Sequence, residues 1–310
     1  MSQASEDTRS LPTVAIHSLI LVITIILSLA GNLLVCLAFY RNRRLRTITN
    51  YYVLSLALMD ILMATFSYLF ITVASVLREW PFGFNFCQFN GFFSYFWCVI
   101  SQGILALTAV NRYFCIVKPQ FYPTLFSKKK TVLSIIFVWV FIFTVLLAAT
   151  FLTPNVYRWH FQYLFCQAII NDEILEDIAF TVTYTIVLVV VPTCIILFCY
   201  GSVHCAIRRH NTAVIPSLRE ANGQGTLSAH EVQASRVLLA AVIAFFLCWM
   251  PATIVNILER VAQSSIPSFC QSLHTLSAAC SSWINPIIYG VMNRAMRNEF
   301  KKLLHCQKDN

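Results

Sequence analysis

Asp60 is an acidic residue deep within a long apolar stretch of the chain, where an ionisable group is costly and therefore indicates a function. The neighbours expected around it all carry side-chain oxygens: Asn32, Ser101, Ser281, Ser282 and Asn285. Such a set suits a sodium ion or a network of water molecules, and we predict a cation site that involves Asp60, Ser101 and Asn285. A polar cluster that only holds helices together is the alternative.

Arg112 and Glu231 are candidates for an ion pair. Ser94, Cys98, Ser101, Leu105, Thr108 and Arg112 recur at steps of four and three, so they share one helix face, which must point into the protein. A similar face on a later stretch begins at Glu231. An arginine at the end of such a face needs a counter-charge or water, and we predict that Glu231 supplies the charge. Solvation of both residues at a membrane edge is the alternative, because interfacial ion pairs contribute little.

Cys87 and Cys166 stand apart from the other cysteines, most of which lie inside apolar stretches and behave as small hydrophobes. Both are expected on the side that faces an oxidising compartment, so we predict a disulfide between them. Cys270 lies near the same side, and we expect it to be a free thiol. Cys306 follows an amphipathic segment and is a candidate for palmitoylation, with an unmodified thiol as the alternative.

The elements that must position these residues are seven long apolar stretches, each sufficient for a helix to cross about 30 Å of hydrocarbon. They are residues 14–39, 51–77, 89–117, 132–153, 178–207, 232–257 and 268–291. With 58% hydrophobic and 11% charged residues, the chain differs from a soluble domain, of which about 25% is charged. We predict an all-α membrane protein: a seven-transmembrane helix bundle plus a short amphipathic interfacial helix.

The orientation in the membrane follows from the basic residues. Eighteen of the 22 Lys and Arg residues fall on one side of the predicted bundle, which is the mark of the cytoplasmic side. Residues 1–13 are then extracellular, residues 14–291 form the bundle, and residues 292–310 form a cytoplasmic amphipathic helix and tail. The net charge of +9 faces anionic lipid rather than nucleic acid. We expect the first stretch to be retained, because Glu6 and Asp7 replace the basic leader of a signal peptide.

Pro192, Pro251 and Pro286 fall inside the predicted helices, where each removes a backbone hydrogen bond and is expected to kink the helix. Asn285 can satisfy the backbone group that Pro286 frees. We do not expect an enzyme, because the seven histidines are scattered and the sequence suggests neither a metal cluster nor a nucleophile with its base.

Several motifs recur in a fixed order along the seven stretches. They are Gly31-Asn32, Leu56-Ala57-Leu58-Met59-Asp60, Cys87, Asn111-Arg112-Tyr113, Trp139, Pro192, Tyr200, Cys248-Trp249-Met250-Pro251 and Asn285-Pro286-Ile287-Ile288-Tyr289. Each motif is weak alone, but together they cover nearly the whole chain and are highly specific. On these motifs the chain resembles the rhodopsin-family (class A) G-protein-coupled receptors.

The resemblance implies a plasma-membrane receptor that converts the binding of an extracellular ligand into activation of a heterotrimeric G protein, through an outward swing of the sixth helix. The residues that it implies for the activation switch are Arg112, Glu231, Tyr200, Phe245, Trp249, Pro251, Asn285, Pro286 and Tyr289. Sodium at Asp60 would favour the inactive state, and no other cofactor is expected. Arrestin, a receptor kinase and membrane lipid are the further partners that the resemblance implies.

Three positions depart from the family pattern. Asn111 replaces the usual acid before Arg112, which removes one restraint on the arginine and is expected to raise basal signalling. Gln102 replaces an aliphatic residue beside Pro192 and Phe245, and we expect the contact there to be wetter or differently tuned. Ser281-Ser282 replaces Asn-Ser, which leaves the sodium ligands open.

The class of ligand is restricted mainly by residues that other receptors carry and this chain lacks. Ser94 stands where amine receptors carry an aspartate, and Ala279 stands where opsins carry the retinal lysine, so neither a cationic amine nor covalent retinal is expected. Asn111-Arg112-Tyr113 is similar to melatonin-type receptors, from which Pro286 departs. An aromatic outer pocket suits a small neutral or weakly polar ligand. We predict that the ligand contacts Ser94, Tyr95, Cys98, Gln167, Tyr184, Trp249, Asn256 and Thr275.

Three alternatives remain open at the level of sequence. An acidic outer segment that contains Asp172, Glu173, Glu176 and Asp177 is compatible with a cationic peptide ligand. A transporter could use broken helices around Asp60, although no repeat relates the two halves of the chain. A ligandless modulatory partner of another receptor is the third alternative.

Overall fold

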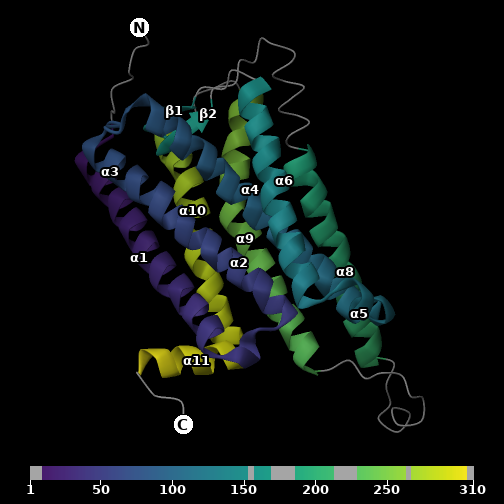
Figure 1. Cartoon of the computed structure of the whole chain (residues 1–310). Helices are drawn as coiled ribbons and strands as arrows, with labels where there is room; N and C mark the ends of the chain where they lie inside the picture. The colour runs from purple at the N-terminus through teal and green to yellow at the C-terminus, as the bar shows by residue number, and fades with distance from the viewer. Residues whose placement is uncertain (1–8, 153–156, 169–185, 213–228, 263–266, 306–310) are drawn as a thin grey trace, which may run out of the picture.

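The computed structural model describes residues 9–152, 157–168, 186–212, 229–262 and 267–305. Within these residues, long helices run side by side as one bundle (Figure 1), which confirms the predicted fold. The helices of the bundle are α1 (Leu11–Arg41), α2 (Ile48–Met63) with α3 (Leu69–Leu77), α4 (Gly83–Ile116), α6 (Lys128–Leu152), α8 (Val191–Thr212), α9 (Ala229–Ala262) and α10 (Ser268–Met292). The short helix α5 (Tyr122–Leu125) follows α4.

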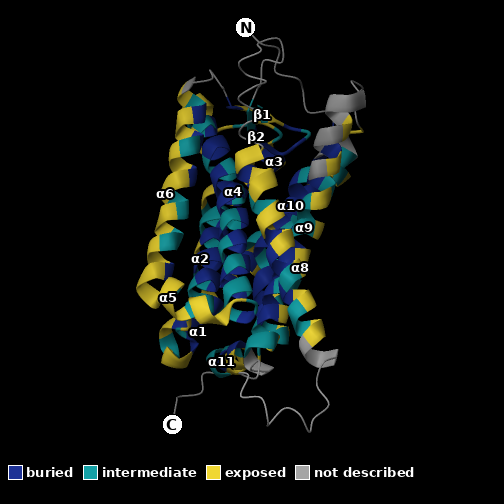
Figure 2. Cartoon of the chain, turned by 90° about the vertical axis from the view of Figure 1, so that its right-hand side faces the viewer, coloured by how far each residue is buried: buried dark blue, intermediate teal, exposed yellow. Residues whose placement is uncertain are grey.

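The outer surface of the bundle is apolar. Six helical stretches of the described chain are long and apolar enough to cross a membrane, and α10 packs with them as the seventh member of the bundle. Large hydrophobic side chains such as Leu133 and Phe137 on α6 point outward and are 64% and 68% exposed. Figure 2 shows the same division, with exposed residues on the outer side of α6 and buried residues along α4. A surface of this kind requires lipid around it.

Two π-helical segments interrupt the regular α-helical structure of the bundle. One, Ala64–Tyr68, joins α2 to α3, and the other, Ile186–Val190, leads directly into α8. Pro192 is the second residue of α8, so its missing backbone donor falls where the helix has just changed its hydrogen-bonding pattern. Pro251 and Pro286 lie inside α9 and α10, as the sequence predicts. The beginning of the predicted fifth span lies outside the described residues.

Most helices extend beyond the predicted apolar stretches. The first helix begins at Leu11 rather than Val14, because Ser10 accepts a hydrogen bond from the backbone of Thr13 and caps it. Helix α4 begins at Gly83, well before Phe89, and carries Cys87 on its first turns. The helices thus include polar residues at their ends and extend past the apolar stretches from which the sequence predicts them.

Helix α1 approaches α10 closely at Gly31. An added Cβ at Gly31 would lie 2.8 Å from Cβ of Pro286, so only glycine fits there. The C-terminal helix α11 (Arg294–Leu304) turns away from α10 at Asn293, whose side chain accepts from the backbone of Ala295 and Met296. It lies across one end of the bundle (Figure 1), where the sequence predicts an interfacial helix.

A small hairpin closes the opposite end of the bundle. Strands β1 (Tyr157–His160) and β2 (Phe165–Ala168) pair antiparallel, with Arg158 opposite Gln167 and Trp159 opposite Cys166. Below, the two ends of the molecule are called the hairpin end and the α11 end.

Candidate functional site

The predicted ion pair is present at the α11 end of the bundle. Nη1 of Arg112, near the end of α4, lies 2.5 Å from Oε2 of Glu231, in the first turn of α9. The arginine side chain is only 1% exposed, whereas the glutamate side chain is 38% exposed. The pair therefore joins two helices through a buried positive charge on Arg112 and a negative charge on Glu231 that solvent can reach.

Arg112 has further partners that the sequence does not reveal. Its Nη2 donates to the hydroxyl of Thr49 on α2 at 2.6 Å, and its Nε donates to Oδ1 of Asn111 at 3.1 Å. The amide of Asn111 thus keeps a hydrogen-bonded restraint on the arginine, although it lacks the charge of the usual acid. Cys115 adds a contact from its Sγ to Glu231 at 3.4 Å. The arginine is held by α2, α4 and α9 at once.

The other predicted switch residues line the path from this pair into the bundle. Tyr200 on α8 and Tyr289 on α10 are 5% and 2% exposed, and among the described residues their hydroxyls have no hydrogen-bond partner. The rings of Phe245 and Trp249 on α9 pack with centroids 5.9 Å apart, one turn before Pro251. Two buried hydroxyls without partners are suited to an arrangement in which they gain partners by moving.

A hollow of about 430 Å³ lies beside the ion pair at the α11 end. Its walls come from α2, α9, α10 and α11 and include Thr49, Glu231, Tyr289 and Arg294. Arg44 and Arg294 make this end basic, while Glu231 is the acidic side chain in the lining. A cavity with such walls would grow if the Glu231 end of α9 moved away.

Asp60 lies 6% exposed between α1, α2 and α10. Nδ2 of Asn285 lies 3.4 Å from its Oδ2, and Ser282 is a second hydrogen-bonding neighbour of the carboxyl group. Asn32 instead donates to the carbonyl of Ser282 at 2.8 Å, and its own Oδ1 is buried without a hydrogen-bond partner among the described residues. A carboxylate beside an unsatisfied amide oxygen fits a cation such as sodium.

Ser101 stays a predicted ligand of a cation in this cluster, because a hydroxyl that donates its proton keeps its oxygen lone pairs. Its hydroxyl donates to the carbonyl of Trp97 in its own helix at 3.0 Å, as serine often does in apolar helices. Ser28, which sequence reasoning missed, also takes part: its Oγ lies 3.3 Å from the backbone carbonyl oxygen of Asp60 and 3.5 Å from that of Ser282, and it can donate to either one. Ser281 also donates within its own helix, to the carbonyl of Ala278.

The predicted disulfide is present and anchors the hairpin to α4. Cys87 and Cys166 are joined, with their Cα atoms 5.6 Å apart. Gln88 strengthens the same junction, because it donates to the carbonyl of Tyr157 at 2.5 Å and accepts from its amide at 2.8 Å. Burial of Tyr157 between the hairpin and α4 raises the pKa of its phenol. Gly91 makes the approach feasible, since an added Cβ would lie 2.8 Å from the carbonyl oxygen of Cys166.

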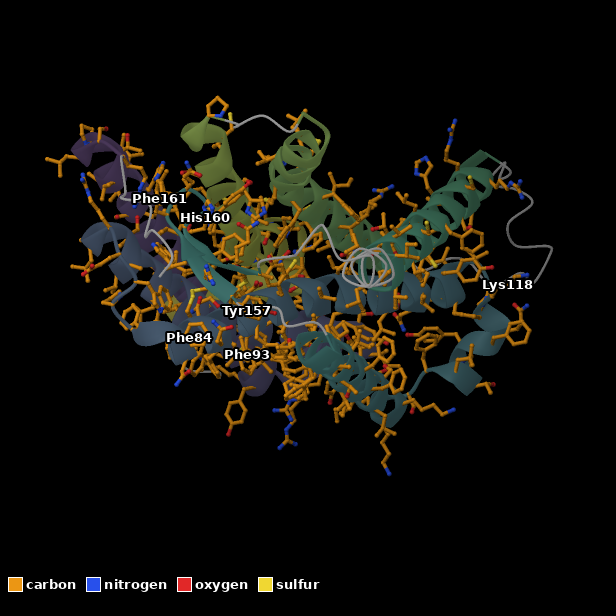
Figure 3. The ribbon with its side chains drawn as sticks, turned by 90° about the horizontal axis from the view of Figure 1, so that it is seen from above. Phe84, Phe93, Lys118, Tyr157, His160 and Phe161 are labelled. Atoms are coloured by element: carbon orange, nitrogen blue, oxygen red, sulfur yellow. A yellow bond between two sulfur atoms is a disulfide. The ribbon has the colours of Figure 1, made fainter. Side chains whose placement is uncertain are left out.

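The turn of the hairpin fills the space in which a ligand is predicted. Seen from the hairpin end, Tyr157, His160 and Phe161 lie between the side of α3 and α4 and the side of α9 and α10 (Figure 3). Leu164 is fully buried, and Tyr163 and Phe165 are 3% and 9% exposed. They form one apolar cluster with Leu21, Ala64, Tyr68, Ile71, Val255, Leu276 and Ala279. The outer pocket is therefore already occupied by the chain itself.

Several predicted ligand contacts are engaged with this hairpin. Thr275 donates to the carbonyl of Tyr163, and Tyr95 packs at 6.0 Å from the ring of Phe165. Gln167 belongs to β2, opposite Arg158. Sequence reasoning missed His274, whose ring stacks on Phe165 at 5.6 Å. The position of the loop turn could not be read from the sequence, because a hairpin of this kind is located by its disulfide and its partners rather than by a pattern.

The remaining predicted ligand contacts are dispersed. Ser94 donates to the carbonyl of Asn90 at 2.7 Å and to Ser67 at 3.1 Å, so its hydroxyl is used within the bundle. Cys98 is a half-buried thiol on α4, and Trp249 lies deeper, beside Phe245. Tyr184 and Cys306 lie outside the described residues, and so does the side chain of Asn256.

Gln102 makes two direct hydrogen bonds to residues that flank Pro192. It is 6% exposed, and its Nε2 donates to the carbonyl of Val189 at 2.9 Å and to the hydroxyl of Thr193 at 2.8 Å. Both acceptors flank Pro192. The side chain is a direct bridge between α4 and the interrupted start of α8, where the neighbouring π-helix offers a carbonyl for it. This bridge is in line with a differently tuned contact at Gln102, and a wetter contact stays a prediction.

The chain is similar to known membrane receptors along most of its length. Residues 31–289 match the family model described as 7 transmembrane receptor (rhodopsin family). Melatonin receptor type 1A of Gallus gallus is 27% identical over 296 residues, covering 92% of this chain and 79% of that protein. G-protein coupled receptor 161 of Xenopus tropicalis is 25% identical over 315 residues, covering 93% and 60%. The crystal structure of squid rhodopsin aligns with a TM-score of 0.83 at 21% identity, covering 98% of this chain and 90% of that one, which shows a shared fold.

Proposed function

The chain belongs to the rhodopsin family of seven-transmembrane receptors, and from this premise we propose that it couples a small neutral or weakly polar extracellular ligand to a heterotrimeric G protein. It is a multi-pass membrane protein and a receptor rather than an enzyme. Membership of this family sets the transporter alternative aside. Consistent with the positive-inside rule, we place the hairpin end outside the cell and the α11 end in the cytoplasm.

The observation that carries the proposal is the contact between Arg112 and Glu231. Because the arginine is buried and its partner is half-exposed, protonation or displacement of the glutamate leaves a charge that is stable only if water or another protein reaches it. The Glu231 end of α9 can then move outward and enlarge the hollow at the α11 end. A G-protein segment entering there would meet Arg112 and two tyrosines, Tyr200 and Tyr289. The hydroxyls of these tyrosines are without partners among the described residues.

The ligand acts at the other end of the same helices. A molecule that binds at the hairpin end can shift the equilibrium only if it contacts α9 or α10 differently in the two states. Trp249, Phe245 and Pro251 on α9 connect that end to Glu231. A ligand there has to displace the hairpin turn, and it would then meet the aromatic rings and hydroxyls that the turn now contacts, such as Tyr95 and Thr275. Such side chains suit an uncharged ligand with a few polar groups.

The other expected partners follow from the same arrangement. A sodium ion at Asp60 would hold α1, α2 and α10 together through Asn285 and so favour the closed state. Arrestin and a receptor kinase would recognise the open form of the α11 end, and membrane lipid would contact α11 and, if Cys306 is palmitoylated, its acyl chain.

Nucleotide exchange on purified G proteins tests the proposal. The intact chain in lipid nanodiscs is incubated with one G protein from each subtype, and binding of a non-hydrolysable GTP analogue is followed. Glu231→Ala should cause faster nucleotide exchange than the intact chain on at least one G-protein subtype. Arg112→Ala should cause no exchange above the level seen with empty nanodiscs. If Glu231→Ala, correctly folded, activates no subtype, the chain is not a G-protein-coupled receptor of the proposed kind.

A further inference from the structure

Gln233 joins the beginning of α9 to the end of α10 at the α11 end of the bundle. Its Nε2 donates to the backbone carbonyl oxygen of Met292 at 3.0 Å. Met292 is the last residue of α10, and α11 begins two residues later, at Arg294. The bond therefore ties the end of α9 that carries Glu231 to the junction of two other helices.

The Met292 carbonyl needs a partner from outside its own helix. The last four carbonyl groups of an α-helix cannot be satisfied by the helix itself in the regular pattern. In α10, the carbonyl of Val291 accepts from Nη1 of Arg297 on α11 at 3.1 Å. The carbonyl of Met292 accepts from Gln233. Helix α9 thus supplies part of the cap of α10, and it can do so only while the two helix ends lie together.

Glu231 and Gln233 hold α9 from different sides. Successive residues of an α-helix are about 100° apart around its axis, so these two side chains leave α9 about 200° apart. Glu231 reaches Arg112 on α4, and Gln233 reaches Met292 on α10. Both side chains line the hollow of about 430 Å³ at this end of the bundle. An outward movement of this end of α9 has to break both contacts.

We propose that Gln233 is a positioning residue of the closed state, a second latch that holds α9 against α10 beside the Arg112–Glu231 pair. The inference rests on the proposed function, in which this end of α9 moves outward to admit a G protein. When α9 moves away, Nε2 of Gln233 and the Met292 carbonyl are left to water, so the net free energy of their bond stabilises the closed state alone. Because Gln233 is exposed, water replaces the bond well, and the latch contributes less than a buried one.

Two substitutions separate the donor group of Gln233 from the rest of its side chain. Gln233→Met keeps the length and the helix propensity of glutamine but has no N–H group. Gln233→Lys restores a donor, and its positive charge is favourable beside the carbonyl groups at a helix C-terminus. Gln120→Met is the matched control, because it makes the same change at an exposed glutamine of the short 3-10 turn Pro119–Phe121.

Cys115 provides a readout of the latch that needs no G protein. This half-buried thiol on α4 lies 3.4 Å from Oε2 of Glu231, so it becomes more accessible when the end of α9 moves away. The full chain in nanodiscs is treated with N-ethylmaleimide, and the rate of alkylation at Cys115 is followed by mass spectrometry of its peptide. A thermal unfolding midpoint for each variant establishes that it is folded.

Gln233→Met should raise the alkylation rate of Cys115 about threefold, because the loss of one exposed hydrogen bond shifts the balance toward the open state by a small factor. Gln233→Lys should return the rate to the level of the intact chain, and Gln120→Met should leave it unchanged. An unchanged rate in folded Gln233→Met would overturn the proposal. So would a rate that rises as much in Gln233→Lys as in Gln233→Met, because the donor would then have no role.

Nucleotide exchange on G proteins, measured with the same variants and with Glu231→Ala, separates this inference from the proposed function. A raised alkylation rate in Gln233→Met, without nucleotide exchange in any variant, supports the latch and contradicts G-protein coupling. Exchange caused by Glu231→Ala, together with an unchanged alkylation rate in Gln233→Met, supports coupling and contradicts the latch.

Discussion

Nε2 of Gln102 lies 2.8 Å from the hydroxyl of Thr193, and this bond ties the middle of α4 to the first turn of α8 just beyond Pro192. The same amide donates to the carbonyl of Val189 in the π-helical segment. The Gln102 side chain thus fixes the position of α8 relative to α4. The bond lies between the hairpin end and the ion pair.

Removal of either partner of this bridge should lower the stability of the receptor, and part of the loss should be common to both variants because each removes the same hydrogen bond. Gln102→Leu and Thr193→Val are each expected to lower the thermal midpoint in nanodiscs, and the double variant should cost less than their sum. Interhelical hydrogen bonds in membranes contribute about 0.6 kcal/mol, so the coupling should be of that order. Strictly additive effects would show that the bridge does not form.

Gly91 should tolerate no side chain, because an added Cβ would lie 2.6 Å from the ring of Tyr157 as well as close to the Cys166 carbonyl. Gly91→Ala is expected to displace the hairpin and to lower the thermal midpoint and the surface level of the receptor. Gly201→Ala is the matched control, since its added Cβ meets nothing within 4 Å. Equal midpoints for the two variants would contradict the close docking of the hairpin.

Leu164 combines complete burial with a left-handed backbone, at φ 61°. Truncation to alanine should cost about 2–5 kcal/mol of stability through lost packing. Leu164→Gly loses the same side chain but relieves the backbone, so it should be about 1 kcal/mol more stable than Leu164→Ala. The thermal midpoints of the two variants compare them directly. A lower midpoint for glycine would argue against the left-handed conformation of the turn.

Sodium should stabilise the receptor through Asp60. Replacing potassium by sodium at constant ionic strength is expected to raise the thermal midpoint of the intact chain and to lower its basal signalling. Asp60→Asn keeps the shape of the side chain but removes the charge that a cation requires, so both effects should vanish. Val53→Ile, a conservative change in the apolar part of α2, serves as the control. A sodium effect that persists in Asp60→Asn would place the ion elsewhere.

The sequence predicts the bundle well because membrane helices are recognised by length and apolarity alone. It also predicts the Arg112–Glu231 pair and the Cys87–Cys166 disulfide, since helical spacing and membrane side restrict the available partners. Thr49 and Ser28 could not be predicted in the same way. A single hydroxyl in an apolar helix is compatible with a bond to its own backbone, and only the packing of α1, α2 and α10 decides the partner.

The outer pocket is where sequence reasoning was weakest. The sequence predicts that Thr275 meets a ligand but does not indicate its bond to the carbonyl of Tyr163. The depth to which Leu164 enters the bundle depends on the disulfide, on Gly91 and on the reciprocal bonds of Gln88, which act together across the fold. The partners of Gln102 could not be predicted for a similar reason, because the carbonyl of Val189 becomes available only through a π-helical segment that no sequence period indicates.

Basal G-protein activation by Glu231→Gln tests the central claim most directly. This variant keeps the shape of the side chain and removes only the charge that holds Arg112, while Glu231→Asp keeps the charge on a shorter stem. At matched surface expression, we predict that Glu231→Gln signals several times more strongly than the intact chain, that Glu231→Asp stays close to it, and that adding Arg112→Met silences the signal. Basal activation by Glu231→Gln that equals or falls below that of the intact chain would contradict the claim that the Arg112–Glu231 ion pair holds the receptor in its inactive, closed state.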